Sequence, residues 1–217
     1  MFAVSVKQMR EADQYTIAKG TPSKELMRRA AQGVFDAYPG WAAAKTLIVC
    51  GPGNNGGDGY ALASIMKDKD LDVTVLRVSE KFSEDGVFYY ELCKEKGVPV
   101  LVYGTDDVDF ESYQIIVDCM LGTGFEGAPR EPISSVIDEI NYAHAAAYVF
   151  VISVDINSGM NGDTGEAEAA VVSDLTVSIG CYKNGFFQGK APDLIGGLVN
   201  VDIGIEFPEE QGSGEMS

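Results

Sequence analysis

The stretch Val49-Cys50-Gly51-Pro52-Gly53-Asn54-Asn55-Gly56-Gly57-Asp58-Gly59-Tyr60 decides the fold of this 217-residue chain. It follows directly on an apolar run, residues 46–50, and leads into a helix-like pattern over residues 60–67. A strand, a glycine-rich loop and a helix in this order present backbone N–H groups and a helix N-terminus to a phosphate. The loop also carries two asparagines and an aspartate, which a simple phosphate-binding loop does not need. We therefore interpret it as part of a site with further chemistry.

Downstream of this loop, strand-like and helix-like segments alternate. Near-continuous apolar strands that alternate with helices indicate a parallel sheet covered on both faces. The predicted fold is α/β, with three α/β/α layers around a Rossmann-like, doubly wound, mostly parallel sheet. The expected strands are residues 46–50, 72–78, 98–102, 113–120, 148–156, 174–180 and 198–203, and the expected helices are residues 57–69, 132–145 and a segment from Ser83 to Lys96-Gly97.

Two extra N-terminal helices precede the first expected core strand. Ser5-x-x-Gln8 has the pattern of a capping box, and the first helix is expected to end at Lys19-Gly20. The second is expected to begin at Thr21-Pro22 and to end at Pro39-Gly40. Together they form an extension that could cover a sheet face or join a dimer contact.

Composition excludes several classes of partner. The formal net charge is −17, from 33 acidic and 16 basic residues, so nucleic acid and anionic membranes are not expected ligands. Residues 1–217 show no internal linker or repeat, which predicts a single domain, and residues 208–217 are expected to form a frayed polar tail.

The cysteines and the hydropathy pattern indicate a reducing compartment. None of the four cysteines, Cys50, Cys93, Cys119 and Cys181, lies in a C-x-x-C pair, and His144 is the only histidine, so no zinc site is expected. No run approaches the ~18 apolar residues of a membrane span. We therefore expect a soluble, cytoplasmic protein with cysteines that act as small buried apolar side chains.

Glycine-rich turns that carry oxygen ligands follow four of the expected strands. They are the opening loop and residues 118–127, 155–165 and 180–185. Open parallel sheets bind ligands beyond the carboxyl ends of their strands. Asp118 and Asp155 each end an apolar run, where a carboxylate is costly to bury without a partner. As a group, these turns favour a functional over a purely structural role.

Each of these residues, taken alone, has a simpler explanation. Asn55 could stabilise its turn through an Asx hydrogen bond. Asp118 could cap a turn, and Ser158 could cap the segment that follows Asp155. Lys183 could be a solvated loop lysine, as most lysines are.

The loop also matches the dinucleotide fingerprint, Gly51-x-Gly53-x-x-Gly56, but a single match is common by chance. A conventional NAD dehydrogenase would carry an acidic ribose ligand at the end of the next strand. That strand ends at Arg77-Val78-Ser79, which disfavours a dehydrogenase.

Taken together, the motifs resemble the NAD(P)H-hydrate epimerase family, the YjeF N-terminal domain. The resemblance covers nearly the whole chain, and the double-asparagine, double-glycine loop is its most specific part. The matching motifs are Leu26-Met27-x-Arg29-Ala30, Asn54-Asn55-Gly56-Gly57-Asp58-Gly59, Asp118 with Gly122-Thr123-Gly124, Val154-Asp155-Ile156-x-Ser158-Gly159 with Asp163-Thr164-Gly165, Lys183-x-Gly185 and residues 197–205.

The resemblance implies a Rossmann-like fold, a homodimer, a bound potassium ion and a reaction. The family interconverts the R and S forms of the hydrated cofactors NADHX and NADPHX. Potassium would be ligated by Asn55, Asp118 and Ser158, whose amide, carboxylate and hydroxyl oxygens suit a hard cation. The implied substrate-binding residues are Asn54, Asn55, Gly56, Gly57, Asp58, Gly122, Thr123, Gly124, Phe125, Glu126, Gly127, Ala128 and Asp155.

The reaction inverts one carbon that bears a hydroxyl beside the ring nitrogen. Loss of hydroxide to give an iminium-type cation, followed by addition of water to the other face, requires an acid/base group near that hydroxyl. We expect Asp155 to act as this group, with Lys183 as a proton donor or phosphate contact. One departure is Asn157, where the family usually has proline, and this change could loosen the loop of Asp155 and Ser158.

Two further possibilities remain open at the level of sequence. The same fold could serve as a non-catalytic nucleotide-binding or partner-binding module. The family's domain is also often fused to, or acts with, an ADP- or ATP-dependent NAD(P)H-hydrate dehydratase, and nothing in this chain resembles that second domain.

Overall fold

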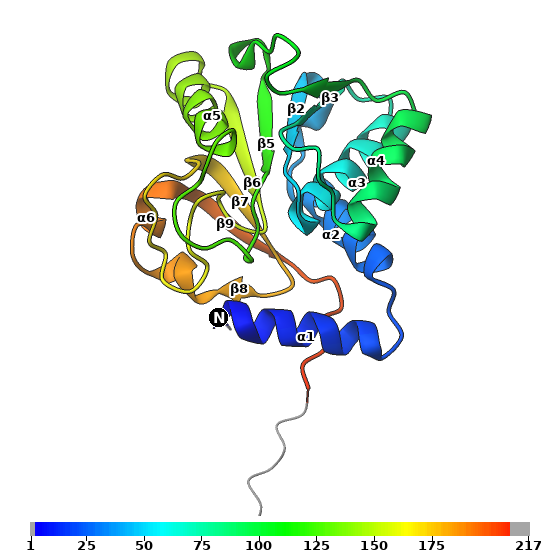
Figure 1. Ribbon diagram of the computed structural model, residues 1–217, viewed down its shortest axis with the longest axis vertical. Helices are drawn as coiled ribbons and strands as arrows, with labels where there is room; N and C mark the ends of the chain where they lie inside the picture. The colour runs from blue at the N-terminus through cyan, green and yellow to red at the C-terminus, as the bar shows by residue number, and fades with distance from the viewer. Residues whose placement is uncertain (1–2, 209–217) are drawn as a thin grey trace, which may run out of the picture.

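The computed structural model describes residues 3–208 and contains the predicted sheet (Figure 1). Within these residues seven strands pair in parallel in the order β4-β3-β2-β5-β6-β7-β9. The chain therefore diverges at β2 and β5, and such a switch point is where open sheets bind ligands. The strands are β2 (Thr46–Cys50), β3 (Val73–Arg77), β4 (Val100–Val102), β5 (Ile115–Cys119), β6 (Phe150–Val154), β7 (Ser173–Ile179) and β9 (Ile195–Val201).

Helices cover both faces of the sheet, which confirms the predicted three-layer α/β/α fold. The alternation of side chains along β2 builds both cores, because Ile48 and Cys50 face one layer while Leu47 and Val49 face the other. The helices of the first layer are α2 (Ser23–Ala37), α3 (Asn54–Asp68) and α4 (Glu84–Glu95), and α5 (Ile133–Ala147) covers the second.

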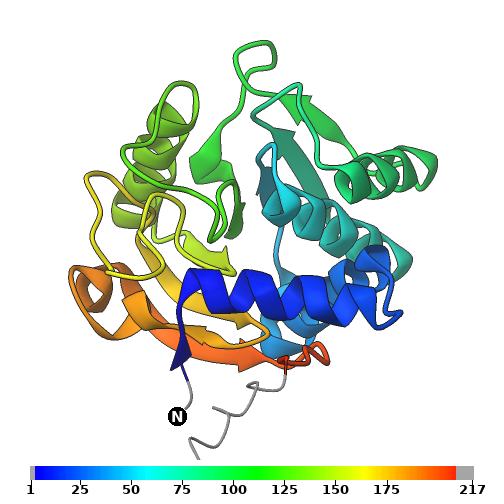
Figure 2. The same cartoon turned by 60° about the horizontal axis from the view of Figure 1, so that its bottom comes forward.

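The two N-terminal helices have different roles. The α2 helix packs on α3 and covers a sheet face, one of the two roles expected for this extension. The α1 helix (Val6–Ala18) begins with the predicted capping box of Ser5 and Gln8. It crosses the carboxyl end of the sheet in Figure 2 and does not cover a face. A ligand site at this end of the sheet therefore has α1 as a wall.

Short strands hold the first turn of α1 in place. The β1 strand (Ala3–Val4) pairs with β8 (Tyr182–Lys183) in a separate two-stranded sheet. Two-residue strands have no hydrophobic periodicity, and the sequence analysis did not predict them. It also missed the 3₁₀ turns η1 (Gly40–Ala43), η2 (Phe110–Ser112) and η3 (Asn184–Phe187), and the short helix α6 (Ala191–Leu194).

Two element boundaries near the predicted site differ from expectation. The α3 helix begins at Asn54 rather than at Gly57, because Gly53 is its N-cap residue. Asn54 and Asn55 therefore lie in the first helical turn and not in a free loop. Asp118 lies within β5, paired with Ser153 of β6, and not in the turn after the strand. The strand over residues 46–50 has the predicted bounds, and the ends of the other predicted elements differ by a few residues.

Other expectations concern the cysteines and the ends of the chain. Cys50, Cys93 and Cys119 are free and buried as expected, whereas Cys181 is partly exposed. None of the described helices has the length and apolar character needed to cross a membrane. Of the expected frayed tail, residues 209–217 lie outside the described part of the chain.

The glycines of the opening loop allow a prediction about stability. A Cβ atom on Gly51 would lie 1.9 Å from the Met120 carbonyl oxygen, whereas one on Gly53 would meet nothing within 4 Å. We therefore expect Gly51→Ala to lower the free energy of unfolding by about 2 kcal/mol or more. Gly53→Ala, the matched control, should change it by less than about 0.5 kcal/mol. Urea denaturation followed by circular dichroism measures both, and equal effects would contradict this steric assignment.

Candidate functional site

A cavity of about 580 Å³ opens where the glycine loop after β2 and the turn after β5 diverge. This volume is typical of a small-molecule site. The two segments are in direct contact, since Gly51 N–H donates to the Cys119 carbonyl at 3.1 Å. Eight of the predicted substrate residues line the cavity: Asn54, Asn55, Asp58, Gly122, Thr123, Gly124, Phe125 and Asp155.

The remaining predicted residues lie around this cavity. Gly56 and Gly57 are buried in the first turn of α3 and do not line it. Glu126, Gly127 and Ala128 are exposed and line a neighbouring, smaller hollow of about 320 Å³. Asp118, Ser158 and Lys183 are fully buried behind the cavity wall and are connected to it through hydrogen bonds.

Asp118 and Ser158 form a buried pair that joins the loops after β5 and β6. The Asp118 carboxylate accepts hydrogen bonds from Ser158 N–H at 2.8 Å and Ser158 Oγ at 2.5 Å. It also accepts from Ser153 Oγ and Met120 N–H, both at 3.1 Å. Burial raises the pKa of Asp118, and these hydrogen bonds oppose the increase. Asp118 thus caps the turn that follows it and also binds Ser158. The main role of Ser158 is this contact with Asp118, and not the capping of the segment after Asp155.

Asn55 connects α3 to both of these loops. Its Nδ2 atom donates to the Leu121 carbonyl at 2.9 Å and to the Val154 carbonyl at 3.0 Å. The side chain therefore does not form the local Asx turn considered above. Its Oδ1 atom is buried and has no hydrogen-bond partner. An unpaired buried amide oxygen costs free energy, and a bound cation would remove this cost.

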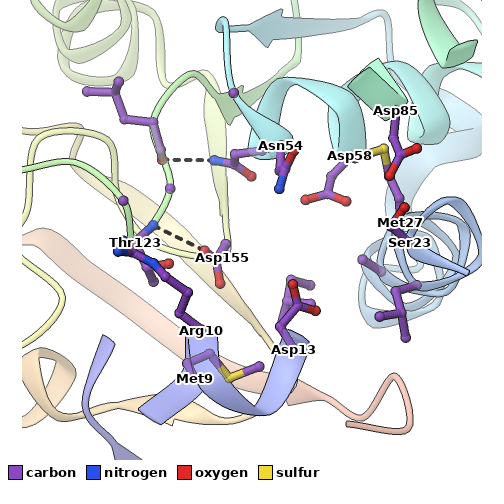
Figure 3. A pocket seen from close by; sticks show the side chains of 18 of the residues that line it. Met9, Arg10, Asp13, Ser23, Met27, Asn54, Asp58, Asp85, Thr123 and Asp155 are labelled. Atoms are coloured by element: carbon purple, nitrogen blue, oxygen red, sulfur yellow. Dashed lines mark hydrogen bonds between the residues drawn. The ribbon is translucent and has the colours of Figure 1, made fainter. Parts of the chain in front are cut away.

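Asp155 lies at the wall of the cavity in a strained backbone conformation. Its φ of 66° is unusual for a residue with a side chain, and such strain is often found at active sites. Its Oδ2 atom accepts from Thr123 N–H at 3.3 Å (Figure 3). Its Oδ1 atom forms an ion pair with Lys183.

Lys183 is fully buried, so it is not the solvated loop lysine considered above. Besides Asp155, its Nζ atom donates to the Ile179 carbonyl at 2.9 Å and to Ser178 Oγ at 3.3 Å. All three Nζ protons therefore have partners. This buried ion pair holds the Asp155 carboxyl in one orientation at the cavity wall.

The sequence analysis missed the wall of the cavity that α1 and α2 contribute. Met9, Arg10, Asp13 and Ile17 line it from α1, and Asp13 points toward the side of Asp58 and Asp155 in Figure 3. Residues 9, 13 and 17 have the spacing of one helix face, which was visible in the sequence. The missing information was where this face lies in the fold. The other unexpected lining residues are Ser23, Leu26, Met27, Ala30, Pro52, Gly53, Asp85, Met120, Leu121, Ile179 and Ile203.

Two half-buried carboxyls in the cavity have raised pKa values. Burial is the main cause for Asp13, followed by the negative charge of Asp155. Burial is also the main cause for Asp58, whose pKa is raised well above its usual range, followed by Asp155 and Asp13, while Lys183 opposes the shift. A protonated carboxyl can act as an acid or as a hydrogen-bond donor at neutral pH.

Comparison with known proteins shows which sequences and which fold resemble this chain. The sequence profile of the family described as YjeF-related protein N-terminus matches residues 23–185. The NAD(P)H-hydrate epimerase of Limosilactobacillus fermentum is 34% identical over 208 residues, which cover 92% of this chain and 96% of the relative. The NAD(P)H-hydrate epimerase of Weissella koreensis is 32% identical, and the match covers 94% of that relative. The crystal structure of yeast ynu0, YNL200c, superposes with a TM-score of 0.77 over 92% of this chain and 87% of that one. At 24% identity, that similarity concerns the fold.

Longer relatives also match. The bifunctional NAD(P)H-hydrate repair enzyme Nnr of Escherichia coli is 38% identical over 189 residues, 84% of this chain. The match spans only 35% of the length of that relative.

Asn157 fixes the loop of Asp155 and Ser158 and does not loosen it, so the expectation of a loosened loop was wrong. It is fully buried, and its Nδ2 atom donates to the Val171 carbonyl and Ser173 Oγ at 2.9 Å and to the Leu194 carbonyl at 3.1 Å. Its Oδ1 atom accepts from Thr176 Oγ1 at 2.7 Å. The side chain thus connects the loop to β7 and α6.

This network predicts that Asn157→Ala lowers the free energy of unfolding by about 3 kcal/mol, because buried polar partners are left unsatisfied. Ser173→Ala, which removes one partner of Asn157, should cost less than half as much. Urea denaturation measures both. A loss below about 1 kcal/mol for Asn157→Ala would contradict a structural role for the amide.

Proposed function

Because this chain belongs to the YjeF N-terminal family, we propose that it is an NAD(P)H-hydrate epimerase that interconverts the R and S forms of hydrated NADH and NADPH. The observation that carries the proposal is Asp155, an aspartate in a strained conformation that a buried lysine holds at the wall of the cavity. A non-catalytic binding module does not require such a pair. A dehydrogenase is also disfavoured, because the end of β3 carries Arg77, stacked 5.7 Å from the Phe82 ring, and no ribose carboxylate.

The dinucleotide binds through the first turn of α3 and the α1 wall. The backbone N–H groups of this turn and the positive end of the helix dipole favour the pyrophosphate. Arg10 is the one cationic side chain among the described residues that line the cavity. It lies near the Gly122–Gly124 turn, since a Cβ on Gly124 would be 3.8 Å from an Arg10 guanidinium nitrogen. We assign Arg10 to a phosphate of the substrate.

We further propose that Asn55, Asp118 and Ser158 belong to a potassium site. The support is chemical: Asn55 Oδ1 is a buried oxygen without a partner, the amide nitrogen of Asn55 contacts the Leu121 and Val154 carbonyls, and Ser158 Oγ lies 3.4 Å from the same Leu121 carbonyl. Rotation of the Asn55 amide would place Oδ1 beside the Leu121 and Val154 carbonyls, an arrangement that only a cation stabilises. A potassium ion held by these residues would supply positive charge to a site that takes an anionic substrate.

In the proposed reaction, the substrate's ring nitrogen expels the hydroxyl group as water once the hydroxyl oxygen is protonated, which leaves an iminium-type cation. Water then adds to the other face and loses a proton. Asp155, ion-paired with Lys183, accepts that proton and stabilises the cation electrostatically. Inversion results because departure and addition occur on opposite faces.

The same relatives guide proposals about context. We propose that the protein acts as a cytoplasmic homodimer, together with an ADP- or ATP-dependent dehydratase that consumes one epimer. Support for the dehydratase comes from relatives named as bifunctional repair enzymes. The family resemblance supports the homodimer, and the free cysteines support a reducing compartment.

The central test follows the R/S ratio of purified R-form NADHX by chromatography. We expect the protein to speed relaxation of this ratio, and to do so more in potassium than in sodium. Asp155→Asn should lower the rate at least ~100-fold, as expected when an acid/base group is lost. Asp138→Asn, on the exposed side of α5, is the control and should retain the wild-type rate. Relaxation no faster than in buffer would contradict the proposed function.

A second experiment addresses Arg10. We expect Arg10→Ala to raise KM about 10-fold, the effect of one charge-assisted hydrogen bond to phosphate, with little change in kcat. Lys7→Ala, an exposed lysine one turn earlier on the same helix, should leave KM unchanged. If the KM values of these two variants are equal, the phosphate contact lies elsewhere.

A further inference from the structure

We propose that Asp13 of α1 is a second catalytic residue, the acid that protonates the departing hydroxyl group. Asp13 and Asp155 lie on different walls of the cavity. This inference rests on the proposed epimerase function and deepens it. Inversion by loss and re-addition of water needs a proton donor on one face of the ring and a proton acceptor on the other. Asp155 and Lys183 supply only one side.

The position of Asp13 fits this role. It lies one helical turn from Met9 and one from Ile17, and all three line the cavity from one face of α1. Figure 3 shows its carboxyl on the cavity side of the helix, apart from Asp155, with Asp58 on a third wall. Within the described residues its carboxyl has no hydrogen bond and no ion pair. A half-buried carboxyl that has no partner in the protein is available to a ligand.

Both ends of α1 are fixed, so Asp13 is preorganised. At the N-terminal end, Val6 N–H donates to Asp163 Oδ1 at 2.8 Å. Beyond Asp13, Thr16 Oγ1 accepts from Glu206 N–H at 2.8 Å. Val4 of β1 pairs with Lys183 of β8, and Lys183 forms the ion pair with Asp155. The start of α1 is therefore connected to the residue that positions Asp155. The two carboxyls are therefore held by parts of the fold that contact each other.

Their electrostatic environments differ in the way an acid and a base require. Asp155 contacts the buried ammonium of Lys183, whereas no cation among residues 3–208 forms an ion pair with Asp13. Burial and the charge of Asp155 raise the pKa of Asp13, so it retains its proton to higher pH. The other charged groups that face this part of the cavity are Arg10 on α1, Asp58 on α3 and Asp85 on α4. Two carboxyls in such contrasting surroundings are a common acid and base pair.

The proton balance closes without another reactant. The carboxylic acid of Asp13 gives its proton to the hydroxyl oxygen, the C–O bond breaks, and water and the iminium-type cation form. A water molecule then attacks the opposite face, the new C–O bond forms, and the Asp155 carboxylate accepts the proton. Transfer of one proton from Asp155 to Asp13 through solvent restores the starting state.

The test compares Asp13→Asn with wild type over a range of pH. Asp13 must be protonated to act as the acid, so wild-type kcat should fall as pH rises through the raised pKa of Asp13. We expect Asp13→Asn to lower kcat at least ~100-fold, to leave KM within twofold, and to remove the fall at high pH. Glu11→Gln, the same change on the exposed face of α1, is the control and should match wild type.

Folding is checked independently. Because the pKa of Asp13 is higher in the folded than in the unfolded protein, the ionised carboxyl lowers stability as pH rises through that interval. Asp13→Asn removes this effect, so its melting temperature at neutral pH should equal or exceed that of wild type. Should this variant not fold, Asp13→Ser is measured in its place.

The outcomes separate the two proposals. If wild type itself fails to speed epimerisation, the proposed function fails. If wild type is active and Asp13→Asn keeps its kcat, or changes only KM, Asp13 is not the acid. If kcat no longer falls at high pH in Asp58→Asn but still does so in Asp13→Asn, the acid is Asp58 and the inference is overturned.

Discussion

The buried carboxylate of Asp118 is the constraint on which the site depends. It lies in the middle of the central strands, where an ion without partners would be strongly destabilising. Four hydrogen bonds from Ser153, Ser158 and Met120 satisfy it. Because two of these come from Ser158, the loop after β6 has to lie against the end of β5. Loss of one hydrogen bond to such a buried charged group costs about 1.5–3 kcal/mol.

This contact fixes where the reactive residue lies. Ser158 is three residues beyond Asp155, and Asn157 ties the same loop to β7 and α6. Held from both sides, the loop can keep Asp155 at a positive φ that it would not adopt alone. Lys183 then completes the arrangement from β8. Buried polar groups that satisfy one another therefore define the geometry of the cavity wall, while the apolar layers above and below supply the stability of the sheet.

The sequence predicted the sheet well because its signals are local. Continuous apolar strands and glycine turns identify parallel β-α units, and Asn54, Asn55 and Asp155 follow strand ends where such sheets bind ligands. The burial of Lys183 could not be predicted from the sequence. It depends on a contact with Asp155, which is distant in the sequence, and on a hydrogen bond to the Ile179 carbonyl that follows no regular pattern. The role of α1 was missed for a similar reason. Its place over the cavity follows from a two-residue strand pairing and from a contact with Glu206, 190 residues beyond Thr16.

The net charge of −17 conflicts with an anionic dinucleotide ligand only if every carboxyl in the cavity is ionised. Asp155 is neutralised by Lys183. Asp13 and Asp58 both have raised pKa values, so the cavity holds less negative charge than its composition implies. Arg10 and the N-terminus of α3 then meet less opposing charge in the cavity, while salt screens the negative charge of the outer surface. Burial, which raises the pKa of these carboxyls and so favours their role as acids, thus also reduces their repulsion of the substrate's phosphates.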